Sequence, residues 1–103
     1  MLDWAEQNPG KAAAAWHSVA NLFYLVDGKT TEFIEELSEF VDIPPTGSEA
    51  LRYSLSLKFK DFEDAMQVAA ADTFSAQCIV TRNLKHYKQS PIKALSPQDF
   101  MGR

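Results

Sequence analysis

Apolar side chains recur every three or four residues after Asp61, a spacing typical of a helix that buries one face. Asp61 is a favourable N-cap for this helix, because its carboxylate can accept a backbone N–H of the first turn. The expected buried face is made mostly of small side chains: Phe62, Ala65, Met66, Ala69 and Ala70. We therefore predict a helix here whose small side chains let it approach a sheet closely.

The same periodicity predicts four helices earlier in the chain, over residues 2–7, 19–26, 30–41 and 49–58. Ser18 and Ser48 are the expected N-caps of the second and the fourth. In the fourth helix, Leu51 and Leu55 are expected to face inward. The outer face of the third helix is acidic and is interpreted as solvated: Glu32, Glu35, Glu36 and Glu39.

Short apolar runs between these helices predict strands at residues 41–43, 78–80 and 91–95, the second of them fully buried. A last helical turn is expected over residues 96–100, and residues 84–90 are expected to form a loop. Helices that alternate with short strands indicate an α/β protein with a mainly parallel sheet. Residues 81–83 then lie at the carboxyl end of a strand, where open α/β sheets bind their ligands.

Composition limits the chain to one globular domain over residues 1–103, because 103 residues can bury one modest core. The net charge of −4 argues against a protein that coats nucleic acid. The charge is unevenly distributed, since five of the ten Lys and Arg lie in residues 82–103 with only one acid. This basic segment would suit a phosphate backbone, although an uneven solvated surface explains it equally well.

The cellular compartment follows from the single cysteine and from the absence of long apolar runs. Cys78 cannot form an internal disulfide, and its apolar surroundings favour an inert thiol in a reduced cytosol. No apolar run is long enough to span a bilayer, and no signal peptide opens the chain. We therefore expect a soluble, cytoplasmic protein without a membrane partner.

Three motifs in a fixed order carry a resemblance to a known family. They are Asp-Phe-Glu-Asp-Ala at 61–65, Ile-Val-Thr-Arg-Asn at 79–83 and Ser-Pro-Gln-Asp-Phe at 96–100. Together they resemble the C-terminal half of a PIN domain, the fold of VapC-like toxins and related metal-dependent ribonucleases. The resemblance implies a three-layer α/β/α sandwich and a further strand near residues 14–18. It also implies that the first strand of the family is missing ahead of Met1, or that the chain begins late.

Asp61, Glu63 and Asp64 place three acids at one helix start. The helix dipole stabilises a carboxylate in its ionised form there, so these side chains are suited to bind Mg²⁺ or Mn²⁺. Asp61 and Asp64 are three residues apart and can point to the same side, whereas Glu63 points elsewhere. Simple helix capping by Asp61 and Asp64 is the alternative explanation.

The resemblance assigns roles to individual positions. It implies that Asp64, supported by Asp61, is the metal ligand, and that Asn21 and Asn83 orient metal-bound water or phosphate. Asn21 stands where the family has a glutamate, and His86 stands where an Asp is often found. The residues expected to contact RNA are Thr81, Arg82, Lys85 and Lys88.

Two functions of different classes are compatible with the sequence. The first is a Mg²⁺- or Mn²⁺-dependent ribonuclease of the VapC type, with RNA as substrate, an antitoxin as partner and a dimeric state. The second is a catalytically silent PIN-like module that binds a partner or dimerises, favoured by the incomplete set of acids. His17 and His86 have no partners at zinc-like spacing, and His86 and Tyr87 are expected in a partly exposed loop.

Overall fold

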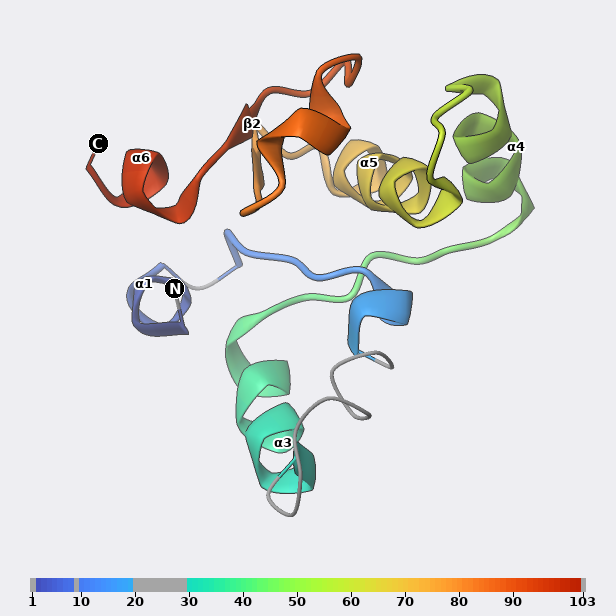
Figure 1. Cartoon of the computed structure of the whole chain (residues 1–103). Helices are drawn as coiled ribbons and strands as arrows, with labels where there is room; N and C mark the ends of the chain where they lie inside the picture. Colours follow the sequence, from blue (N-terminus) through green and yellow to red (C-terminus); the bar gives the residue numbers. More distant parts are fainter. Residues whose placement is uncertain (1, 9, 20–29, 103) are drawn as a thin grey trace. The chain divides into compact units, whose positions relative to one another are not determined.

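The structure, a computed structural model, describes residues 2–8, 10–19 and 30–102 (Figure 1). The chain forms two compact units, Met1–Pro44 and Pro45–Arg103. Except for Val19, the helix predicted over residues 19–26 lies outside the described residues. The parallel pairing and the helices described below make this an α/β protein, as the sequence predicts.

The N-terminal unit contains the helices α1 (Leu2–Gln7) and α3 (Thr30–Phe40), which pack against each other. Both confirm the predicted helices at these positions. After α1 the Asn8 amide donates a hydrogen bond to the carbonyl oxygen of Trp4 at 2.8 Å. Gly10 then adopts a positive φ of 78°, which a residue with a side chain rarely adopts, and the chain turns away from the helix axis there.

The strand predicted near residues 14–18 is wrong, since residues 16–19 form a helical turn. The chain instead makes one parallel bridge, between Ala13 and Asp42. Two backbone hydrogen bonds of 2.9 Å hold this bridge, from the Ala14 N–H to the Asp42 carbonyl and from the Asp42 N–H to the Ala12 carbonyl. The edge strand predicted at 41–43 is thereby reduced to a single residue, because the alanine run opposite it has low strand propensity.

The sheet of the C-terminal unit consists of β1 (Ile79–Val80) and β2 (Ala94–Leu95) in parallel. Hydrogen bonds from the Ile79 N–H to the Lys93 carbonyl (2.8 Å) and from the Thr81 N–H to the Leu95 carbonyl (2.9 Å) extend the pairing. This confirms the parallel sheet, although β1 is half-buried rather than fully buried. The segment between the strands contains a 3₁₀ helix, η1 (Leu84–Tyr87), where a loop was predicted.

Helix α5 (Phe62–Phe74) supplies most of the core of this unit. Its N-cap is Asp61, as predicted, and Ser75 ends it in a left-handed conformation. Three of the predicted inward alanines are buried, together with Val68, which is fully buried. Phe62, in contrast, is 41% exposed. The prediction that Phe62 belongs to the buried face is therefore wrong.

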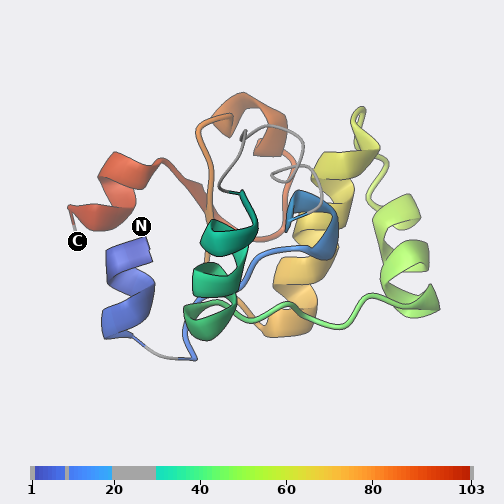
Figure 2. The ribbon, with the colours of Figure 1, turned by 90° about the horizontal axis from the view of Figure 1, so that it is seen from below.

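Helix α4 (Ser48–Ser56) packs along α5 (Figure 2). Its N-cap is Gly47 rather than the predicted Ser48. Leu51 and Leu55 are 52% and 60% exposed, so the expectation that they face inward is wrong. The buried residue of this helix is Ser54, whose hydroxyl donates a hydrogen bond to the Ala50 carbonyl at 2.8 Å and so satisfies its polar group.

The C-terminal helix α6 (Pro97–Met101) follows β2 directly and confirms the predicted last helical turn. The Ser96 hydroxyl accepts a hydrogen bond from the Asp99 N–H at 3.0 Å, which caps the helix. Among the described residues, no helix combines the length and the apolar character that crossing a bilayer requires.

Candidate metal centre

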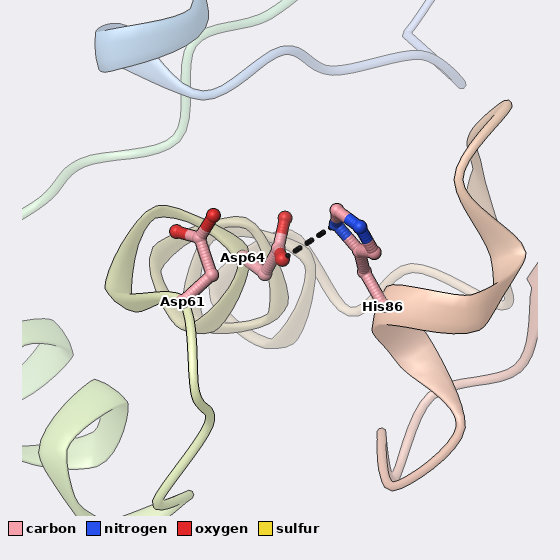
Figure 3. Close-up of side chains that lie close together, drawn as sticks. All are labelled: Asp61, Asp64 and His86. Atoms are coloured by element: carbon pink, nitrogen blue, oxygen red, sulfur yellow. Dashed lines mark ion pairs between the residues drawn. The ribbon is translucent and has the colours of Figure 1, made fainter.

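Two carboxylates stand at the start of α5. Asp61 has extended backbone angles, and one of its oxygens accepts a hydrogen bond from the Glu63 N–H at 2.8 Å. Asp64 follows within the first turn, and its side chain is only 16% exposed. Figure 3 shows both carboxylates on the same side of the helix start. The backbone N–H groups of the first turn favour negative charge at this position.

His86 reaches this pair of carboxylates from η1 (Figure 3). Its Nδ1 lies 3.0 Å from Oδ2 of Asp64, and its side chain is 51% exposed. The 3₁₀ turn that carries His86 is closed by a hydrogen bond of 3.0 Å from the His86 N–H to the Asn83 carbonyl. The fold of this short segment therefore places an imidazole beside a carboxylate far earlier in the chain.

Tyr87, the neighbour of His86, holds the other oxygen of Asp64. Its hydroxyl donates a hydrogen bond to Oδ1 at 3.2 Å, and the residue is buried. Its ring meets that of Phe59 edge to face, with the ring centres 6.3 Å apart. Burial, together with the negative charges of Asp64 and Asp61, raises the pKa of the Tyr87 phenol above its ordinary value. The phenol is therefore a persistent donor that fixes the orientation of Asp64.

Asp61, Asp64 and His86 together have the composition of a metal site. Each offers one ligand atom, and these three atoms lie within 4.8 Å of one another. Two carboxylate oxygens and an imidazole nitrogen are common ligands of divalent ions. The residues present therefore fit a divalent ion.

A surface pocket opens around these residues, and its lining combines charged, polar and aromatic side chains. It is lined by Phe59, Lys60, Asp61, Phe62, Asp64, Lys85, His86, Lys88 and Gln89. Lysines therefore flank the two carboxylates on the same surface. Cations beside a metal-binding cluster are suited to a polyanion whose phosphate approaches the metal.

The predicted site residues are distributed unevenly around this centre. The structure brings Asp61 and Asp64 together, and Lys85 and Lys88 line the pocket. Thr81, Arg82 and Asn83 follow β1 but do not line it. The Thr81 hydroxyl instead accepts a hydrogen bond from the Asn83 N–H at 3.0 Å. Asn21 lies outside the described residues.

His86 and Tyr87 contribute more to this centre than the sequence indicated. Their contacts with Asp64 join residues 22 and 23 positions apart, beyond the reach of any local spacing rule. One signal was present, because the resemblance placed His86 where the family often has an acid. A side chain at that position was therefore a candidate to face Asp64.

The fold and this centre define an α/β protein with clustered side chains that fit a divalent ion. A family model described as "PIN domain" matches residues 1–85, and the chain belongs to that family. PIN domains form a nuclease-like family and generally use divalent metal ions. No curated protein and no solved structure matches the chain.

The Tyr87→Phe variant should isolate the contribution of the phenol, since it removes the hydroxyl and keeps the ring against Phe59. The buried hydrogen bond to a carboxylate predicts a loss of about 1–2 kcal/mol in the free energy of unfolding at neutral pH, measured by urea titration. Because folding raises the phenol pKa, its contribution is complete below about pH 10 and is lost as the pH rises further.

Wild-type protein should therefore lose stability above about pH 10 more steeply than Tyr87→Phe. The matched control is Tyr53→Phe on α4, whose half-buried ring belongs to another element. This variant should keep the wild-type alkaline profile. Identical alkaline profiles for wild type and Tyr87→Phe would show that folding does not raise the pKa of the Tyr87 phenol.

Proposed function

We propose that the protein is a divalent-metal-dependent ribonuclease of the VapC toxin type, using Mg²⁺ or Mn²⁺ and acting in the cytoplasm. The observation that carries this proposal is the cluster of Asp61, Asp64 and His86 inside a pocket that lysines flank, in a chain of the PIN family. A divalent ion bound by carboxylates next to cationic side chains is an arrangement that can hydrolyse a phosphodiester.

A bound divalent ion would supply a water nucleophile at neutral pH and would offset negative charge on the phosphate. Asp61, Asp64 and His86 would hold the ion. Tyr87 keeps Asp64 in one orientation, because it is buried and donates to Oδ1. Lys85 and Lys88 line the pocket and would neutralise phosphates of the RNA backbone.

The other site residues expected from the sequence extend the proposal to the rest of the RNA. Thr81 and Arg82 would contact RNA beyond the pocket, while Asn83 and Asn21 would orient phosphate or water. An antitoxin protein is the proposed partner, and a homodimer the proposed assembly. The exposed Leu51 and Leu55 on α4 support the existence of such a contact, because a partner would remove apolar surface from water.

Cleavage of RNA under controlled metal supply tests the proposal. Purified protein, freed of metal with a chelator, is mixed with a set of structured and single-stranded RNAs. Cleavage should appear on addition of Mg²⁺ or Mn²⁺ and should stop when excess chelator is added. The same cleavage in the presence of excess chelator would contradict a metal-dependent nuclease.

Loss of the two pocket lysines should weaken RNA binding through electrostatics alone. For single-stranded RNA, each phosphate contact contributes about 0.7 to the slope of log affinity against log salt concentration. The double variant Lys85→Gln/Lys88→Gln should therefore reduce that slope by about 1.4, measured by fluorescence anisotropy at several salt concentrations.

Lys93→Gln is the control for this measurement, because Lys93 is exposed and does not line the pocket. Its slope should equal that of the wild type. Equal slopes for the double variant and Lys93→Gln would place the RNA on another surface of the protein.

The second candidate function is a catalytically silent module that acts by binding a protein. One observation favours it: both oxygens of Asp64 already have partners within the chain, His86 and Tyr87. A carboxylate with satisfied oxygens gains less from a metal ion. Calorimetric titration with Mn²⁺ separates the two functions, since heat of binding below millimolar metal supports the nuclease and its absence supports the silent module.

A further inference from the structure

The imidazole of His86 distinguishes this centre from one made only of carboxylates. Mg²⁺ is a hard ion that prefers carboxylate, carbonyl and water oxygens, whereas imidazole nitrogen suits first-row transition metals. In this chain two oxygens and one nitrogen lie within 4.8 Å of one another. The donor set therefore favours a different ion from the one that a purely acidic cluster would select.

His86 and Asp64 already lie side by side, as an ion pair whose two atoms are both candidate metal ligands. Nδ1 of His86 and Oδ2 of Asp64 are 3.0 Å apart. The half-exposed imidazole is accessible to an ion from solvent.

The surrounding contacts also favour a defined site. Tyr87 donates to Oδ1 of Asp64, the oxygen that does not face His86, so Oδ2 stays directed at the imidazole. A fixed ligand orientation of this kind strengthens metal binding. Asp61 is held in the same way, because its role as helix N-cap fixes its backbone and one of its oxygens.

We propose that Asp61, Asp64 and His86 form a mixed carboxylate–imidazole site that binds Mn²⁺ and the later first-row divalent ions in preference to Mg²⁺. This inference rests on the proposed metal-dependent function and specifies the ion of the same site. His86 is the residue that sets the preference, because it supplies the only nitrogen ligand of the three.

The His86→Asp variant tests the proposal, since it replaces the nitrogen ligand by an oxygen. Calorimetry measures the dissociation constants of Mn²⁺ and Mg²⁺ for the variant and the wild type. The preference for Mn²⁺, expressed as the ratio of the two constants, should fall by about tenfold or more in the variant. Gln89→Glu is the control, because it adds the same charge at the pocket lining and keeps the imidazole.

Electron spin-echo spectroscopy of bound Mn²⁺ supplies a second measurement that does not depend on activity. Wild-type protein should show coupling to an imidazole nitrogen, and His86→Asp should not. If His86→Asp fails to fold by circular dichroism, His86→Asn serves in its place and should bind Mn²⁺ about tenfold more weakly.

The outcomes separate this inference from the proposed function. Absence of nitrogen coupling in the wild type, or an equal ion preference in wild type and His86→Asp, overturns the role of His86. RNA cleavage that depends on Asp64 would then still support the nuclease. Conversely, a preference for Mn²⁺ that depends on His86 in a chain that cleaves no RNA supports the site and contradicts the nuclease.

Discussion

The Asp64→Asn variant should lose metal-dependent RNA cleavage by at least about a hundredfold, because even residues that only support a metal ligand cost ten- to a hundredfold when changed. Asp64 contacts both His86 and Tyr87. Asparagine keeps the shape of the side chain and can still accept the Tyr87 hydrogen bond. The loss should therefore come from metal binding and not from unfolding. Initial rates of RNA cleavage, measured over a range of Mn²⁺ concentrations that starts below saturation of the wild type, reveal it.

Asp72→Asn is the matched control for this experiment, since Asp72 lies on the same helix and is exposed. It removes the same charge from α5 and should cleave RNA at the wild-type rate. Asp64→Ala should be as inactive as Asp64→Asn if the carboxylate is the essential group. Cleavage that survives in both Asp64 variants would reject Asp64 as a metal ligand.

The helices whose ends are determined by local chemistry were predictable from the sequence. The turn at Asn8 and Gly10 ends α1, and side-chain caps at Asp61 and Ser96 begin α5 and α6. Each of these signals acts over a few residues, so it can be recognised without knowledge of the fold. The parallel pairing of β1 and β2 was predictable for a related reason, since short apolar runs separated by polar segments indicate an α/β sheet.

The orientation of α4 was not predictable in the same way. This helix has nine residues, of which Leu51 and Leu55 are exposed while Ser54 is buried. Hydrophobicity alone predicts that the two leucines are buried. The helix that packs against α4 is α5, whose buried face is made mostly of alanines. A small residue such as Ser54 allows closer approach to that face, and its hydroxyl is satisfied by the Ala50 carbonyl. Packing against α5 therefore determined which residue of α4 is buried.

Only the part of the candidate site that lies within one helix start was predictable from the sequence. Asp61 and Asp64 share one helix start, so their proximity follows from helical geometry. The position of His86 depends on how the chain turns between β1 and β2, and a short 3₁₀ segment leaves no periodic signal. The strand expected near residues 14–18 failed for a comparable reason, because the resemblance suggested pairing that the alanine-rich segment supports only as one bridge.

Val68→Ala should destabilise the protein by about 2–3 kcal/mol, because it removes two buried methyl groups and leaves a cavity in a well-packed helix face. Val68 has no exposed surface and lies between Ala65 and Ala69 on the buried side of α5, the helix that also carries Asp64. Leu55→Ala on α4 removes more apolar atoms, yet it should change the free energy of unfolding by only about 0.5 kcal/mol or less, since Leu55 is 60% exposed. Urea titrations of both variants measure the difference. A larger loss for Leu55→Ala than for Val68→Ala would show that α4 buries its leucines in solution.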